Sequence, residues 1–474
     1  MDRQRFLALA LCVILLLSSG CQPTPDKASV VRRDPDALYA SGGTVSASAE
    51  KTISVNESFA STNGRVRYTL ALDNVSVPPA ALPVLRVTPE PITAESAKRI
   101  AEVLFDGSPM YEPSQLTRAE IAEKIAELER SLEEEALRQE ANGVEKDMKT
   151  LRRARQEQLA YYESIYGSAP ESSVRTPCQW SFFPTTHYIP DWVDGDESIM
   201  ASAEIRGIPY RFWVLNRDAS DYRVHSIYCS DASGSMEIYN SLGYPEPLED
   251  AAQQELKACA AEWIDRMGVG EWVIDYCRQR QIGALDANGA SAESRYIYQV
   301  HASRIYGGTP VVWQPQLGNL KTGDAYASNY YYEEIVFEFG YDRQLVSFRY
   351  EAPERVTETV NEAAPIFPLE EILERVRDHL TLRDTFAYYA SYDADHVDVN
   401  ITELSVGLTR TRIPGSADDF YLLPAVTVRG SYSVYDAAGK PIAGSDYPAP
   451  ALTDYTFLVM NVTDGSVINT ELGY

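Results

Sequence analysis

The chain has 474 residues, with 69 acidic against 42 basic side chains and a formal net charge of -27. This excess of negative charge excludes an ordinary nucleic-acid binder, because contacts with phosphates require an excess of lysine and arginine. Apolar residues make up 45% of the chain and charged residues 23%, proportions that exclude a disordered chain and are typical of a protein with a packed core.

The first residues of the chain carry the pattern of an export signal. Arg3 and Arg5 precede an apolar run over residues 6–17. This run is shorter than the roughly 20 apolar residues that a membrane-spanning helix requires. It therefore predicts a signal peptide over residues 1–20 that is removed from the mature protein.

The predicted signal ends in a motif for lipid attachment. Residues 18–21 read Ser-Ser-Gly-Cys, which resembles the bacterial lipobox, although the first of these positions is usually Leu in that motif. The resemblance implies that Cys21 carries fatty acyl chains of the palmitate type. It also implies that the protein is held on the outer face of the cell membrane, where two acyl chains anchor stably. The alternative is an ordinary secretory signal that is cleaved nearby, with Cys21 incidental.

Residues 21–51 have the composition of a flexible linker. They are rich in Pro, Ser, Ala, Gly and Asp and have no sustained period. We predict a lipidated tether here, and a flexible segment of this length has a root-mean-square reach of about 30 Å. The tether would hold the folded part of the protein outside the membrane, in the zone of the cell wall.

Residues 52–285 are expected to form an N-terminal α+β domain. Apolar and polar residues alternate over residues 66–72, as in a half-buried strand. Further on, Thr117-Arg-Ala-Glu120 has the form of a capping box, and the helical pattern that follows is interrupted at Asn142-Gly143. We therefore predict a helical hairpin over residues 117–166 that serves as a solvated arm. One long helix and a partner-binding coiled coil are the alternatives.

Residues 286–474 are expected to form a C-terminal α+β domain. The segment Arg304-Ile-Tyr-Gly-Gly-Thr-Pro-Val-Val-Trp313 echoes Ile205-Arg-Gly-Ile-Pro-Tyr-Arg-Phe-Trp213, so the order of elements in the first domain is expected to repeat. Strand-strand-helix units with tight turns predict the α+β class. We expect mainly antiparallel sheets with helices packed on one face, plus the projecting helical hairpin.

Four cysteines remain in the predicted mature body besides Cys21. They are Cys178, Cys229, Cys259 and Cys277, and no two have the C-x-x-C spacing of zinc or redox sites. Outside the cytoplasm such thiols can pair, and we consider a Cys259–Cys277 or a Cys178–Cys229 disulfide. The alternative for Cys259 is a buried small residue, because it lies on the apolar face of a predicted helix.

No catalytic or cofactor motif is recognised in the sequence. The five histidines do not form the usual i,i+4 zinc pair, and nucleophile-elbow, Walker and dinucleotide-binding patterns are absent. We therefore predict no metal, no cofactor and no catalytic residue. Catalysis on sugars by a pair of carboxylates is kept as an alternative, since a chain with 69 acidic residues always brings some pair together.

Tyrosine is frequent in this chain, with 31 Tyr against 13 Phe. Tyr330, Tyr331 and Tyr332 are consecutive, and exposed aromatic rings can stack on sugars or peptides. These three residues are therefore the candidate ligand surface. The alternative is cross-strand packing, because Tyr is favoured on half-exposed sheets.

Several segments resemble a known group of lipoproteins. The segments are Leu82-Pro-Val84, Thr117-Arg-Ala-Glu-Ile121, residues 337–353 and Asn461-Val-Thr-Asp-Gly-Ser-Val467. They resemble the Firmicutes lipoproteins grouped as domain of unknown function 6034, and the likeness covers most of the mature chain. That family has no established activity, so the resemblance implies no functional residue. The strand-strand-helix order is also distantly similar to extracytoplasmic modules of the PepSY type.

Together these features favour a membrane-anchored, extracytoplasmic lipoprotein that acts as a non-enzymatic binding or regulatory module. The first alternative is a sugar- or peptidoglycan-binding module that uses a Tyr-rich sheet surface. The second is a hydrolase of envelope polymers with a carboxylate pair. The partners we expect are the membrane, through the lipid on Cys21, and an envelope protein or glycan.

Overall fold

The computed structural model describes the chain from residue 52 to residue 468, with gaps. The described residues are 52–113, 116–142, 147–172, 175–184, 196–219, 222–231, 243–244, 246–282, 295–312, 332–382, 394–413, 416, 419–442 and 455–468. The predicted signal peptide, the tether with Cys21, and Tyr330 and Tyr331 lie outside them. Within the described ranges, no helix is long and apolar enough to cross a membrane.

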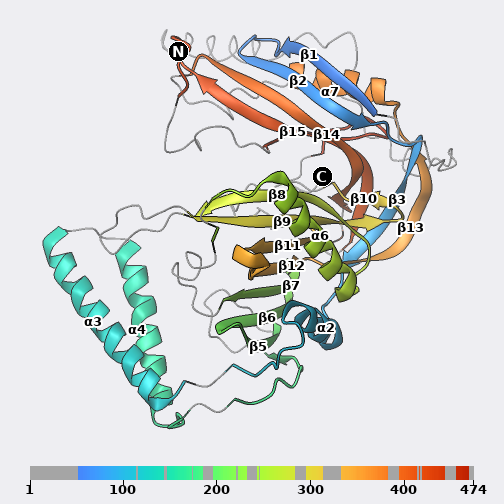
Figure 1. Cartoon of the computed structure of the whole chain (residues 1–474). Coiled ribbons are helices and arrows are strands. Elements are labelled where there is room, and N and C mark those ends of the chain that lie inside the picture. The colour runs from blue at the N-terminus through green and yellow to red at the C-terminus, as the bar shows by residue number, and fades with distance from the viewer. Residues whose placement is uncertain are drawn as a thin grey trace, which may run out of the picture.

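The larger of the two described sheets contains nine strands, and all of its pairs are antiparallel (Figure 1). Its strand order is β10-β9-β11-β12-β7-β6-β5-β4, with β8 paired to β9. Two helices, α2 (Ala94–Leu104) and α6 (Asp250–Met267), pack on its apolar face. The strands are β4 (Phe183–Pro184), β5 (Glu197–Ile205), β6 (Ile208–Ala219), β7 (Tyr222–Asp231), β8 (Trp272–Ile282), β9 (Arg295–Tyr306), β10 (Thr309–Pro310), β11 (Glu334–Phe339) and β12 (Leu345–Glu351).

The second sheet contains seven described strands in the order β1-β2-β14-β15-β3-β13, with β16 paired to β15. Its pairs are antiparallel except for β2 with β14, which run parallel. Helix α7 (Leu369–Leu382) covers one face with Ile372, Val376 and Leu380. The strands are β1 (Thr52–Ala60), β2 (Val66–Ser76), β3 (Ala81–Pro89), β13 (Glu354–Pro365), β14 (His396–Arg412), β15 (Phe420–Tyr435) and β16 (Tyr455–Asn461).

The two sheets and the helices that cover one face of each confirm the predicted α+β class, with mainly antiparallel sheets and helices on one face. The division at residue 285, however, does not coincide with the sheets. Strand β2 pairs with β14, and β3 pairs with β13 and β15, from the far end of the chain. In the nine-stranded sheet, β9 pairs with β8 and β12 pairs with β7 across the same division. The reason is that strand pairing joins segments distant in sequence, such as Val66 with Val397, and such pairing leaves no local signal.

The predicted helical hairpin is present as α3 (Arg118–Asn142) and α4 (Asp147–Tyr166), which pack against each other and project from the nine-stranded sheet (Figure 1). Its capping box forms as expected. The Glu120 carboxylate accepts hydrogen bonds from the backbone N–H and the hydroxyl of Thr117, both at 2.7 Å, and these bonds lower the pKa of Glu120. At the base of the hairpin, Ile121 and Tyr162 share a small apolar cluster.

The two segments that echo each other in the sequence form the same kind of turn. Arg206-Gly207 joins β5 to β6, and Gly307-Gly308 joins β9 to β10. The φ angles of these four residues are 52°, 81°, 57° and 79°, and two successive positive values are what a two-residue type I′ hairpin requires. The echo therefore marks two tight hairpins in one sheet.

Candidate functional site

The face of the nine-stranded sheet opposite α2 and α6 carries polar side chains, and we call it the polar face. Strand register aligns Tyr228, Arg349, Val336, His301 and Tyr276 in one row across β7, β12, β11, β9 and β8. Residues two positions along a strand point to the same face. The neighbouring rows therefore contribute Glu351, Glu334 and Ser303 on one side and Ser347, Glu338 and Gln299 on the other.

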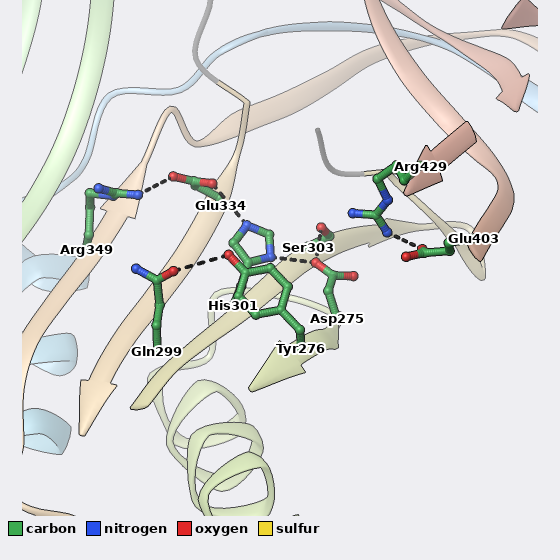
Figure 2. A network of polar contacts seen from close by, with 9 residues as sticks. All are labelled: Asp275, Tyr276, Gln299, His301, Ser303, Glu334, Arg349, Glu403 and Arg429. Carbon is green, nitrogen blue, oxygen red and sulfur yellow. Dashed lines mark hydrogen bonds and ion pairs between the residues drawn. The ribbon is translucent and has the colours of Figure 1, made fainter. Parts of the chain in front are cut away.

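His301 lies at the centre of a hydrogen-bond network on the polar face (Figure 2). Its side chain is fully buried, with Nδ1 2.6 Å from Asp275 Oδ2 and Nε2 3.0 Å from Glu334 Oε2. Burial by itself lowers the pKa of His301, but the hydrogen bonds and charges of the two carboxylates outweigh it and leave the pKa above its ordinary value. Because both ring nitrogens face carboxylates, the geometry suits an imidazolium that donates from both.

Ser303, Asp275 and His301 contain the residue types of a hydrolytic triad but not its arrangement. The Ser303 hydroxyl donates to Asp275 Oδ2 at 2.6 Å, so the carboxylate lies between the serine and the histidine. In a working triad the histidine lies in the middle and accepts the serine proton. Here Nε2 of His301 is held by Glu334 instead. The cluster is therefore a structural network and does not activate a nucleophile.

Arg349 extends the network towards solvent. Its guanidinium donates to Glu334 Oε1 at 2.7 Å and lies 3.3 Å from Glu351 Oε2. The hydroxyl of Tyr228 donates to the other oxygen of Glu351 at 2.5 Å. Burial raises the pKa of Glu351, although the charge of Arg349 opposes the shift. The Arg349 side chain is 41% exposed, so it is held by carboxylates and still reaches water.

Tyr276 covers the buried histidine on the side of β8. Its ring stacks on His301 with centroids 5.1 Å apart and an interplanar angle of 11°. The guanidinium carbon of Arg278 lies 3.8 Å from the centroid of the same ring. Beyond the network, the ion pair Arg429–Glu403 of the seven-stranded sheet lies on the side of Asp275 and Ser303 (Figure 2).

A second polar cluster lies where the two sheets meet. The Glu333 carboxylate accepts hydrogen bonds from the hydroxyls of Tyr306, at 2.6 Å, and Tyr350, at 3.0 Å. Arg304 Nε lies 3.7 Å from the same carboxylate. Burial raises the pKa of Glu333 to about 7, and the charge of Arg304 only partly opposes this shift.

The other half of this cluster belongs to the seven-stranded sheet. Glu354 of β13 and Arg410 of β14 form an ion pair whose side chains are 3% and 5% exposed. The Tyr306 hydroxyl lies 3.4 Å from the carbonyl oxygen of Glu354, which links the two halves. Burial raises the pKa of Glu354, while Arg410 opposes the shift. We call this cluster the sheet junction; its members are Glu333, Tyr306, Tyr350, Arg304, Glu354 and Arg410.

The four predicted disulfide cysteines are all free thiols in the structure, and neither the Cys259–Cys277 nor the Cys178–Cys229 bridge is formed. Cys229 is buried in the core below α2 and α6, and the other three pack against that core. Burial raises the pKa of Cys277 to about 11 and also raises the pKa of the other three thiols. These cysteines therefore act as apolar packing residues.

Alkylation tests this assignment of the cysteines. In denaturant without a reducing agent, the mature body is expected to take up four iodoacetamide adducts, at Cys178, Cys229, Cys259 and Cys277. Prior reduction should leave that number unchanged, as measured by intact mass. The native protein is the control and should take up fewer adducts, because burial suppresses the reactive thiolate. Adducts that appear only after reduction would show a disulfide.

Tyr332, the one described member of the predicted Tyr330–Tyr332 ligand surface, lies in the interior. It is 4% exposed and packs with Tyr306, Val311 and Phe420. Its ring also lies against Arg410, with the guanidinium carbon 5.5 Å from the ring centroid. Tyr332 therefore supports the sheet junction and is not available to a ligand.

The polar network itself was not expected from the sequence. The alternation of Glu334, Val336 and Glu338 with apolar residues does indicate a strand with one polar face. It does not indicate that His301 and Asp275 lie opposite these carboxylates, because that depends on strand register. In the described part of the chain, no group of three or more His, Cys, Asp or Glu side chains is suited to a metal ion.

Comparisons with known proteins add little to this geometry. No protein-family model matches the chain, and no curated protein matches it. Among solved structures, it is similar to the crystal structure, at 1.45 Å resolution, of an uncharacterized protein from Eubacterium rectale ATCC 33656. The sequence identity is 9%, the TM-score is 0.38, and the match covers 87% of this chain and 93% of that chain.

Proposed function

We propose that this protein is a lipid-anchored binding or regulatory module on the outer face of the cell membrane, without catalytic activity of its own. The Ser-Ser-Gly-Cys21 motif and the tether over residues 21–51 support the anchoring. The hydrogen bonds of His301 support the proposed lack of catalytic activity. Both ring nitrogens are held by carboxylates and the ring is fully buried, so the histidine has no atom left for a substrate.

The rim of the polar face supports a role in binding. Arg349 is held by Glu334 and Glu351 but is partly exposed, and Tyr276 is held between His301 and Arg278. Guanidinium and aromatic groups that are already held in place lose little conformational entropy when a partner binds. Such groups dominate the energetics of many interfaces.

Metabolic labelling with a fatty-acid analogue tests the anchor. The wild-type protein is expected to incorporate the label and to sediment with membranes. The Cys21→Ser variant lacks the acylated thiol and is expected to lose the label and enter the medium. Equal labelling of the two proteins would contradict lipid attachment at Cys21.

Cross-linking on intact cells tests the binding role. We expect a specific envelope partner, identified by mass spectrometry, whose recovery falls at least fivefold in the Tyr276→Ala variant. Tyr341→Ala is the matched control, because Tyr341 is 60% exposed and lies off the polar face, at the turn between β11 and β12. The alternative function, a hydrolase of envelope polymers, would instead be favoured if the purified protein cleaved cell-wall fragments and lost this activity when one carboxylate was changed.

A further inference from the structure

The seven-stranded sheet carries a groove on the face opposite α7. The groove has a volume of about 710 Å³ and lies over β1, β2, β14 and β15. On the other face of the same strands, Tyr68 and Val399 are buried beneath α7. An open groove of this volume lies in the size range of small-ligand sites, roughly 300–1,000 Å³.

Two rows of short polar side chains form the floor of the groove. Register across the four strands aligns the residues of each row as neighbours on one face. The first row is Ser58, Thr69, Asn400 and Ser431, and the second is Ala60, Arg67, Asp398 and Ser433. No aliphatic side chain larger than that of alanine lies in either row, so the floor offers hydroxyl, amide, carboxylate and guanidinium groups.

The groups on the floor are accessible to a ligand. Arg67 and Asp398 form a loose pair at 3.9 Å, with side chains 58% and 47% exposed. Thr69 and Asn400 are also exposed. At one end the groove is lined by Tyr435, whose ring stacks on His396 with centroids 5.0 Å apart. His396 is itself held by Asp395 at 3.0 Å, so the aromatic group is fixed in place.

This set of groups fits an uncharged polyhydroxylated ligand. Hydroxyl groups both donate and accept hydrogen bonds, and Ser, Thr, Asn, Asp and Arg side chains can meet both needs. The single cation and the single anion on the floor balance each other. The chain as a whole carries a net charge of -27, which disfavours anionic polymers. An aromatic ring at the end of the groove can pack against the C–H face of a sugar ring.

We propose that this groove binds a segment of an uncharged glycan, with Asn400, Arg67 and Asp398 as the main hydrogen-bonding residues. The inference rests on the proposed function, a binding module, and names its ligand class. It assigns the ligand to β1, β2, β14 and β15, in place of the Tyr330–Tyr332 surface considered from the sequence.

An oligosaccharide array followed by titration calorimetry tests the proposal. The probes are neutral oligomers of glucose, mannose, galactose and N-acetylhexosamines, applied to the purified mature chain. We expect saturable binding to at least one of them. Asn400→Ala and Asp398→Ala should each weaken it at least 10-fold, and Thr69→Trp, which fills the groove, should abolish it. Asp73→Ala, an exposed change further along β2, is the matched control and should bind normally.

The outcomes separate the groove from the wider function. Absence of binding to every neutral probe, or binding that is unchanged in all three groove variants, overturns the groove proposal. Recovery of an envelope protein that depends on Tyr276 would then leave the binding module standing. Each variant is first compared with the wild type by its thermal unfolding. The Thr69→Trp variant adds bulk to the groove, whereas the two alanine variants remove it, so loss of binding does not depend on one type of change.

Discussion

Replacing Arg410 with Met is expected to lower the free energy of unfolding by about 3–5 kcal/mol at pH 7, the range for removing one partner of a buried ion pair. Arg410 pairs with Glu354, and neither side chain is more than 5% exposed. Without the guanidinium, the Glu354 carboxylate must either stay charged in the interior or take up a proton. Urea unfolding followed by tryptophan fluorescence gives the size of the effect.

Two further variants define the origin of that loss. In the double variant Arg410→Met, Glu354→Gln, no buried charge is left unpaired, so more than half of the lost stability should return. Arg153→Met removes a pair with Glu157 whose side chains are 81% and 63% exposed, and exposed pairs contribute under about 1 kcal/mol. An Arg410→Met variant as stable as Arg153→Met would show that the buried Glu354–Arg410 pair does not contribute to the stability of the protein.

Stability is also expected to fall as the pH rises from about 4.5 to about 8. Glu333, Glu351 and Glu354 have raised pKa values because they are buried. Between pH 4.5 and the raised folded-state pKa, the unfolded chain releases these protons while the folded protein keeps them, so folding becomes less favourable. The shift of Glu333 from 4.5 to about 7 corresponds to about 3 kcal/mol, at about 1.4 kcal/mol per pKa unit.

His301 acts in the same direction. Its pKa is raised above 6.5 by Asp275 and Glu334, which outweigh its burial. Its contribution to stability is therefore complete below pH 6.5 and is lost as the pH rises through the folded-state pKa. The lowered pKa of Glu120 has the opposite sign but acts below pH 4.5, outside this window.

Thermal unfolding between pH 5 and pH 8 measures this dependence. The midpoint is expected to be highest near pH 5 and to decrease steadily towards pH 8. In the Glu333→Gln variant the side chain at position 333 is neutral at every pH, so the midpoint should decrease clearly less between pH 5 and pH 8. Glu358→Gln is the control, because Glu358 is an exposed residue of β13 with no part in the sheet junction. A midpoint that increases from pH 5 to pH 8 would contradict the assignment.

Local sequence determined the elements whose interactions are short-range. The Thr117-Arg-Ala-Glu120 box and the break at Asn142-Gly143 were enough to predict the helical hairpin, because a helix begins and ends through contacts within a few residues. The echo of Arg206-Gly207 in Gly307-Gly308 likewise reflects a turn that is defined by two residues. The export signal and the acylation of Cys21 also rest on local patterns, and they stay predictions.

Which strands share a sheet and which side chains meet depends on pairing between segments that are distant in sequence. Asp275, His301 and Glu334 come from three strands, and their contacts depend on the register of β8, β9 and β11. A shift of one residue would point His301 into the apolar core, because side chains alternate between faces. The same dependence on pairing explains three features that could not be deduced from residue types alone. They are the free cysteines, the buried Tyr332 and the pairing of early strands with late strands in one sheet.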